Sequence, residues 1–312
     1  MYLVCGEALF DFFSENAPEP QASKINYTAI AGGSPFNVAV GLRRLGIDVA
    51  LLAGLSTDYL GRRLQQVLQE EGVRLDYLQD FDAPTTLAMV AVGADGSPHY
   101  SFRGEGCADR LLLPGHLPVL GADVRGLHIG SFALVVQPIA DTLLALVRRE
   151  SGKRLISLDP NVRLNPEPNI EVWRERIGAL VEHADLIKVS DEDLSLLYPE
   201  RDPQSVIEGW LEHRCQLVFL TRGSQGASVF SRHHGTWSVP ARAVMMVDTV
   251  GAGDTFQAAL IAWLTEQQLD SVEGLQRVCR EQIEAMLTFA VSAAALTCGK
   301  TGPDLPFRHQ LD

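Results

Sequence analysis

The residues best suited to chemistry are the nine at positions 248–256, Asp-Thr-Val-Gly-Ala-Gly-Asp-Thr-Phe. An apolar run ends at Val247, and the alanine-rich segment 256–264 has apolar residues at helical spacing, so a glycine-rich turn is predicted to open a helix. Gly251 and Gly253 let the backbone approach a ligand closely. Because the first N–H groups of a helix have no intrahelical partner, this turn predicts an anion site suited to phosphate.

Asp254 lies in the first turn of that predicted helix. A carboxylate there stabilises a helix by itself, by about 0.3–1 kcal/mol, so capping alone is one interpretation. The Gly-Ala-Gly sequence before it favours a base beside a bound phosphoryl group, where it can take the proton of an attacking hydroxyl. Phosphoryl transfer requires little beyond such positioning and electrostatic stabilisation.

A second helix start is predicted within residues 31–46. Ser34 is suited to cap this helix, Pro35 to be its first residue and Gly46 to end it. Two glycines and an amide side chain at the N-terminus of the helix favour a polar substrate pocket over a simple turn. The residues concerned are Gly32, Gly33 and Asn37.

Other polar side chains follow predicted strands. Asp11 comes after a strand predicted at 2–8, near the strand's carboxyl end, where open α/β sheets bind ligands, although a turn aspartate would look the same. The segment 159–163, Asp-Pro-Asn-Val-Arg, has more hydrogen-bonding groups than a turn needs, which favours a functional role. Hydroxyls and glycines at 221–226 are typical of a nucleotide loop and of turns alike. Ser190 and the three acids after it satisfy the rules for a helix start by themselves.

The elements that must position these residues alternate between strand and helix over nearly the whole chain. This alternation predicts an α/β fold with a mostly parallel sheet covered on both faces. Residues 85–92 and 99–103 instead predict a hairpin with a tight turn at 93–97, which suits a lid over a site. Arg103 at the end of the hairpin would reach an anion or point into solvent.

Composition excludes several classes of protein. The net charge of −13 and the lack of a basic stripe argue against nucleic-acid binding. The cysteines number five, are widely spaced and form no CxxC pair, which argues against a disulfide framework or a zinc site. No basic-then-apolar leader and no apolar run of membrane-spanning length appear, so we expect a cytoplasmic protein with no membrane contact.

Three common motifs fail. Gly299-Lys300-Thr301 resembles the end of a P-loop, but position 294 is alanine where the first glycine is required. No G-x-G-x-x-G follows the first strand, which weakens a dinucleotide-dependent dehydrogenase. G-x-S-x-G is also missing, so an α/β serine hydrolase has no nucleophile elbow.

The segments 32–46 and 248–254 together resemble the ribokinase-like, or pfkB, family of carbohydrate kinases, and the resemblance extends over essentially the whole chain. Within that family, segments 159–163, 188–193 and 102–110 look most like fructokinases. The resemblance implies one three-layer α/β/α domain over residues 1–312, with a mostly parallel central sheet and a small β lid at about 12–31 and 73–104. A homodimer formed through the lid is compatible with this resemblance.

The resemblance also implies roles for individual residues. Asp254 would be the catalytic base, and the N–H groups of Gly251, Ala252 and Gly253 the anion hole. The sugar would be held by Asp11, Gly32, Gly33, Asn37, Arg103, Asn161 and Arg163. ATP, the co-substrate, would contact Lys188, Ser190, Thr221, Gly223 and Gly226, and would be accompanied by Mg²⁺. Asp248 and the carbonyl of Val250 match positions that bind a monovalent cation such as K⁺ in many members.

The chain departs from many members at 190–193, where Ser-Asp-Glu-Asp replaces Asn-x-x-Glu, so no magnesium ligand is assigned there. The expected reaction is transfer of the γ-phosphoryl group of ATP to the primary hydroxyl of fructose, giving fructose 6-phosphate. The alternatives are 2-keto-3-deoxygluconate, ribose or a nucleoside as acceptor, or a sugar- or nucleotide-binding regulator without turnover.

Overall fold

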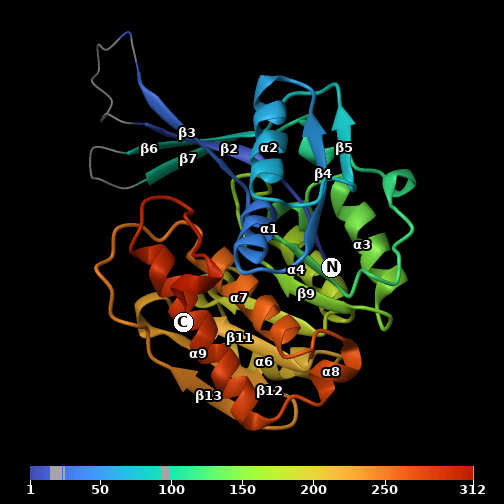
Figure 1. Cartoon of the computed structure of the whole chain (residues 1–312), viewed down its shortest axis with the longest axis vertical. Coiled ribbons are helices and arrows are strands. Elements are labelled where there is room, and N and C mark those ends of the chain that lie inside the picture. Colours follow the sequence, from blue (N-terminus) through green and yellow to red (C-terminus); the bar gives the residue numbers. More distant parts are fainter. Residues whose placement is uncertain (15–22, 24, 93–97, 312) are drawn as a thin grey trace.

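The computed structural model describes residues 1–14, 23, 25–92 and 98–311 (Figure 1). A large twisted sheet runs through the molecule in the order β13-β12-β11-β10-β9-β8-β1-β4-β5. Every strand pair from β11 to β5 is parallel, and β12 and β13 add an antiparallel edge. The strands are β1 (Tyr2–Cys5), β4 (Val49–Ser56), β5 (Leu78–Phe81), β8 (Gly126–Gly130), β9 (Leu155–Asp159), β10 (Leu186–Ser190), β11 (Leu217–Thr221), β12 (Ala227–Ser231) and β13 (Gly235–Val239).

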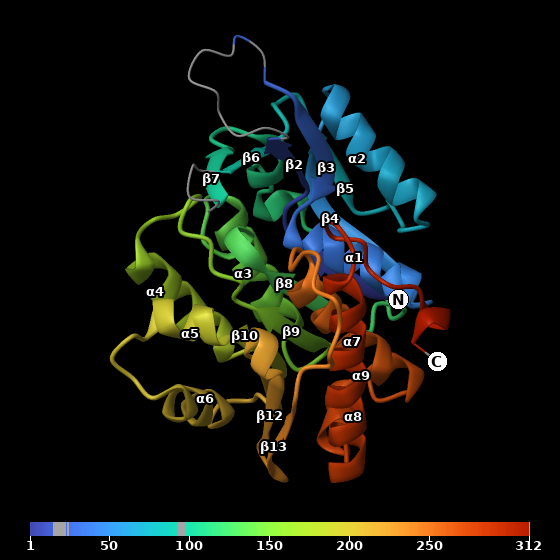
Figure 2. The ribbon, with the colours of Figure 1, turned by 90° about the vertical axis from the view of Figure 1, so that its left-hand side faces the viewer.

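Helices cover both faces of this sheet (Figure 2). One face carries α1 (Ser34–Arg44), α2 (Tyr59–Glu70), α7 (Ala252–Glu266), α8 (Val272–Gln276) and α9 (Arg280–Cys298), and the other carries α3 (Ile139–Glu150), α4 (Ile170–Val181), α5 (Asp191–Leu197) and α6 (Pro203–Leu211). Each helical layer packs its own hydrophobic cluster onto the sheet. The strands from β12 to β4 in the sheet order are buried along almost their whole length because helices cover both faces, whereas the edge strands β13 and β5 are more exposed. The predicted three-layer α/β/α fold is therefore confirmed.

A second, smaller sheet in the order β3-β2-β6-β7 projects from one end of the molecule (Figure 1). Its strands are β2 (Leu9–Ser14), β3 (Tyr27–Gly32), β6 (Leu87–Val92) and β7 (Pro98–Arg103). The antiparallel β6–β7 pair is the predicted hairpin, whose predicted turn at 93–97 lies outside the described residues. The fold therefore includes the small β lid.

The structure corrects several predicted boundaries. The segment 73–104 was expected to belong to the lid, but its β5 pairs with β4 at the edge of the large sheet. The first strand ends at Cys5 rather than at position 8, and Asp11 lies inside β2 rather than in a turn. After α7 the chain forms two helices in succession: Ser271 caps α8, and the side chain of Gln282 accepts a bond from Cys279 N at the start of α9.

Candidate active site

The first turn of α7 is built by the glycine-rich segment, as predicted. Gly251 has a φ of 78°, in the left-handed region that favours glycine, and its carbonyl accepts bonds from Thr255 N and Thr255 Oγ1 at 2.8 Å. A Cβ at Gly251 would lie 2.8 Å from Pro303 Cβ. The helix thus begins at Ala252, whose N–H donates to Thr249 O at 3.2 Å. That bond occupies one N–H of the predicted anion hole.

Asp254 is buried in this turn and is held through both carboxylate oxygens. Ser34 Oγ donates to its Oδ1 at 2.6 Å, and Asn37 Nδ2 donates to its Oδ2 at 2.8 Å. Burial raises the pKa of Asp254, while these two bonds and the nearby charges of Lys188 and Arg163 oppose that rise. A buried carboxylate that is fixed at two points and whose pKa is raised by burial has the properties of a general base.

A polar cluster lies on the lid side of Asp254. Burial and the charge of Asp254 raise the pKa of Asp11 to about 6, and Arg163 opposes the rise. Gly32 lies against Asp11, since a Cβ at Gly32 would lie 2.4 Å from Asp11 Oδ2. Gly33, with a φ of 102°, caps α1 through its backbone. Carboxylate, amide and guanidinium groups in one place can bind several hydroxyl groups of a small polyol.

Lys188 and Asp159 form a buried ion pair beneath the same turn. Lys188 Nζ lies 2.9 Å from Asp159 Oδ2, with side-chain exposures of 5% and 1%. A Cβ at Gly253 would lie 3.1 Å from Lys188 Nζ, so the ammonium group contacts the start of α7 directly. Although burial opposes it, attraction to Asp159 raises the pKa of Lys188. A charged lysine is therefore held where the helix N-terminus already favours an anion.

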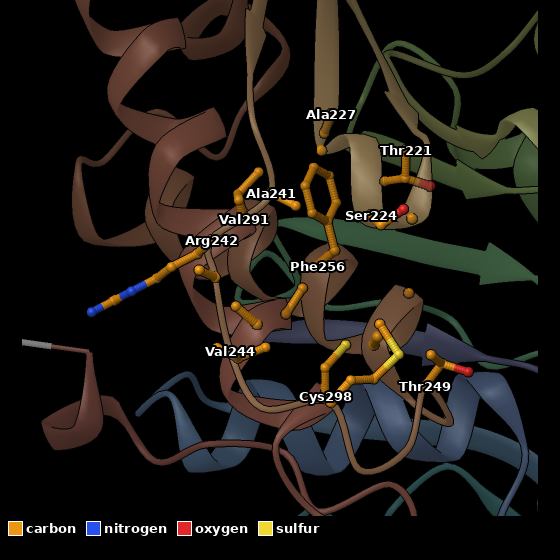
Figure 3. A pocket seen from close by; sticks show the side chains of 18 residues that line it. Thr221, Ser224, Ala227, Ala241, Arg242, Val244, Thr249, Phe256, Val291 and Cys298 are labelled. Atoms are coloured by element: carbon orange, nitrogen blue, oxygen red, sulfur yellow. The ribbon is translucent and has the colours of Figure 1, made fainter.

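A cavity of about 520 Å³ opens on the other side of the α7 N-terminus (Figure 3). Its walls are mostly apolar: Phe256 projects into it, Val291 from α9 and Val244 line it, and the side chain of Arg242 extends away from it. A cavity of this size and composition suits a flat aromatic ring with a polar tail. Three residues predicted for the nucleotide site line it, namely Thr221, Gly223 and Gly226, and Ala252 and Gly253 of the predicted anion hole line it as well.

Asp248 ties the loop before α7 to the C-terminal segment. Its Oδ1 accepts from Val250 N at 3.1 Å and its Oδ2 accepts from Gly302 N at 2.9 Å. The carboxylate and the Val250 carbonyl are oxygen donors, which suit a hard cation. Within the described part of the chain, no group of three or more His, Cys, Asp and Glu side chains is arranged to hold a metal ion.

The remaining predicted residues are placed less centrally. Arg103 is exposed, and its guanidinium donates to Ser101 Oγ and Phe102 O on its own strand. Asn161 has a φ of 42°, an uncommon conformation that is often found at functional sites. Ser190 caps α5 by accepting from Asp193 N.

Both carboxylate oxygens of Asp193 accept backbone N–H groups, from Val162 at 2.8 Å and Ser190 at 3.2 Å. This acid of the 190–193 segment therefore has a structural role in joining α5 to the loop after β9.

Sequence reasoning missed two parts of this site. Ser34 was expected to cap α1, but Gly33 is the cap and the Ser34 hydroxyl binds Asp254 instead. The apolar wall of the cavity was not predicted either, although the small residues of the last helix could have indicated a ligand cavity beside that helix. That wall includes Ala241, Ala243, Val244, Met246, Phe256, Val291, Ala294, Ala295 and Cys298.

Comparison with known proteins decides the family. The family model described as pfkB family carbohydrate kinase matches residues 2–310. The chain belongs to this family. It is accordingly an ATP-binding carbohydrate kinase, a phosphotransferase that uses an alcohol group as acceptor. In the part of the chain that the structure describes, no helix has the length and apolar character needed to span a membrane.

The relatives of this kinase include fructokinases. The fructokinase of Rhizobium leguminosarum bv. trifolii is 36% identical over 279 residues, which cover 88% of this chain and 84% of the relative. The crystal structure of fructokinase from Xylella fastidiosa with bound ATP has a TM-score of 0.90 at 28% identity and covers 99% of this chain and 96% of that one. A double-mutant fructokinase from Vibrio cholerae O395, in a form with fructose, ADP and potassium ion bound, has a TM-score of 0.83 at 26% identity and covers 99% and 96%.

Proposed function

We propose that this kinase is a fructokinase, which transfers the γ-phosphoryl group of ATP to the primary hydroxyl of fructose and forms fructose 6-phosphate. The observation that carries the proposal is the position of Asp254. It lies at the start of α7, with the apolar cavity on one side and the cluster of Asp11 and Arg163 on the other. The relatives named above support fructose as the acceptor.

In the proposed reaction, the adenine and ribose of ATP occupy the cavity and the phosphates extend toward the α7 N-terminus. Asp254, oriented by Ser34 and Asn37, accepts the proton of the sugar hydroxyl. The hydroxyl oxygen then attacks the γ-phosphorus in line, and ADP leaves. The N–H groups of Gly251 and Gly253 and the Lys188 ammonium stabilise the charge on the transferring group.

The sugar is proposed to bind under the small sheet, where Asp11, Asn37 and Arg163 contact its hydroxyls. Gly32 and Gly33 give these side chains room, since a Cβ at Gly32 would meet Asp11. Asn161 and Arg103 are further candidates for sugar contacts. Closure of the small sheet over the sugar would exclude water and limit hydrolysis of ATP.

Two cations belong to the proposal. Mg²⁺ would arrive with the ATP phosphates, whose charge it neutralises when bound, and would need only one or two carboxylates of the protein. K⁺ would bind Asp248 and the carbonyl of Val250, which are oxygen donors beside the first turn of α7. The potassium-bound form of the Vibrio cholerae enzyme supports this choice.

The test is a coupled ADP-release assay with ATP, Mg²⁺ and K⁺ across fructose, ribose, 2-keto-3-deoxygluconate and adenosine. We expect the highest kcat/KM with fructose, and we expect Asp254→Asn to lower turnover by about 10²–10⁴-fold while sugar binding persists. Higher efficiency with another acceptor would keep the kinase and reject fructose. Sugar binding without ADP release from any acceptor would favour a binding protein.

A further inference from the structure

A cluster of polar side chains lies between α7 and the large sheet, next to the Lys188–Asp159 ion pair. His128 of β8, Ser157 of β9 and Gln257 of α7 are all 0% exposed. Gln257 Nε2 donates to Ser157 Oγ at 2.7 Å, and Ser157 Oγ lies 3.2 Å from His128 Nδ1. Because Gln257 is one helical turn after Asp254, these bonds connect the turn that carries Asp254 to two central strands.

The Ser157 hydroxyl links Gln257 to His128. Ser157 Oγ accepts from Gln257 Nε2 and shares a hydrogen bond with His128 Nδ1, in which the donor depends on the tautomer of His128. The imidazole is neutral, since burial and the charge of Lys188 lower the pKa of His128 to about 3. The other ring nitrogen, Nε2, is buried and has no hydrogen-bond partner among the described residues.

Two buried acceptors nearby are also without partners in the described part of the chain: Asp159 Oδ1 and Gln257 Oε1. Gly130 is in register with Asp159 and lies between it and the His128 ring. A Cβ at Gly130 would lie 2.7 Å from Asp159 O, 3.5 Å from Asp159 Cβ and 3.6 Å from His128 Nε2. Buried polar atoms without partners, close to one another, are the conditions in which an internal water molecule binds.

We propose that His128, Ser157 and Gln257 are positioning residues for Asp254, and that one buried water beside Gly130 completes their network. The water accepts from His128 Nε2 and donates to Asp159 Oδ1 and Gln257 Oε1. Asp159 holds Lys188 through its other oxygen, so the network joins the base-bearing turn of α7 to the buried ammonium group. The assignment of a catalytic role to the network rests on the proposed function.

The activity test compares Gln257→Leu and His128→Leu with the wild-type kinase. We expect kcat to fall about tenfold or more while the KM values for ATP and sugar stay within about twofold, because a small displacement of the base affects the transition state most. His128→Gln, which can restore a donor near the position of Nε2, should recover part of kcat.

Gln216→Leu is the matched control, since Gln216 is also buried, also has an unpartnered Oε1, and lies just before β11, at the amino ends of the parallel strands. It should lose stability with kcat unchanged. Equal kcat in Gln257→Leu and wild type, or an equal loss of kcat in Gln216→Leu, would overturn the positioning role.

Two measurements test the network without turnover. A crystal structure at high resolution should contain a water within hydrogen-bond distance of His128 Nε2 and Asp159 Oδ1. The absence of a water there, or a water bonded to other atoms, would reject this part of the proposal. Amide hydrogen exchange at 253–258 should be faster in Gln257→Leu than in Gln216→Leu. If the wild type phosphorylates no acceptor but both of these results hold, the proposed function fails and the network stands as a structural one.

Discussion

Ser34 Oγ donates a 2.6 Å hydrogen bond to Asp254 Oδ1, although 220 positions separate the two residues. The hydroxyl is free for this bond because Gly33, with its positive φ, already caps α1. With Asn37 on Oδ2, the carboxylate is held from the start of a second helix. The two helix N-termini therefore face each other across the proposed reaction centre, and one positions the base of the other.

The first prediction concerns Ser34→Ala. Burial raises the pKa of Asp254 and the Ser34 bond opposes that rise, so removing the bond should raise the pKa further. A base is active when deprotonated, so the acidic limb of kcat should move to higher pH. We expect turnover to fall about tenfold at pH 6, since a hydrogen bond to a charged group contributes about 1.5–3 kcal/mol, and to fall less at pH 8.

The measurement is kcat from pH 5.5 to 9 at saturating substrates. Ser195→Ala is the control, because Ser195 is an exposed serine on α5. An acidic limb that stays in place or moves to lower pH in Ser34→Ala would show that Ser34 does not tune the base.

Much of this fold is readable from the sequence because its signals are local. Apolar runs such as β1 and β11 are buried on both faces, and a strand buried on both faces is mostly apolar. The 251–254 turn is likewise predictable, since only glycine readily adopts the φ of 78° at Gly251.

The parts that sequence reasoning missed depend on tertiary contacts. The pairing of β5 with β4 depends on which edge a short strand meets, and its own residues do not specify that edge. Asp159 and Ser34 have ordinary turn and cap chemistry in the sequence, and their partners Lys188 and Asp254 are 29 and 220 positions away. A local pattern predicts the elements and not the bonds between them.

The second prediction concerns Gly251→Ala. The substitution places a Cβ 2.8 Å from Pro303 Cβ and requires a left-handed conformation that costs about 1–2 kcal/mol for a residue other than glycine. We expect the start of α7 to shift and kcat to fall about 100-fold, as misplacement of catalytic groups by about 1 Å commonly does.

The comparison is with Gly209→Ala in α6, where a Cβ would meet no atom within 4 Å. That variant should keep its activity and gain up to about 1 kcal/mol of unfolding free energy, from the higher helix propensity of alanine. Wild-type kcat in Gly251→Ala would refute the requirement for glycine at this turn.

The third prediction concerns Lys188→Met. Removing one member of a buried ion pair leaves a buried charge and typically costs about 3–5 kcal/mol. Burial raises the pKa of Asp159 to about 6 despite the attraction of Lys188, so without the ammonium the pKa should rise further. The folded variant then binds a proton more tightly than the unfolded chain, and its stability falls as pH rises.

Urea denaturation at pH 5 and pH 8 is the measurement. The loss of unfolding free energy in Lys188→Met should be larger at pH 8 than at pH 5. Lys153→Met, at an exposed lysine, should show almost no loss at either pH. A loss that is equal at both pH values would contradict the account of an uncompensated Asp159 carboxylate.

The fourth prediction concerns the apolar cavity. Ala295 lines it from α9, and Ala295→Phe would place a ring in the cavity volume of about 520 Å³ that we assign to adenine and ribose. We expect the KM for ATP to rise more than about tenfold, since even a small misfit in a hydrophobic pocket costs about 1–3 kcal/mol. The KM for the sugar should stay within about twofold, because the sugar is proposed to bind on the other side of the α7 N-terminus.

Ala285→Phe, on the exposed face of the same helix, controls for the added bulk and should leave both KM values unchanged. Equal increases in both KM values would mean that the cavity is not a separate nucleotide site, and an unchanged KM for ATP would place the nucleotide elsewhere.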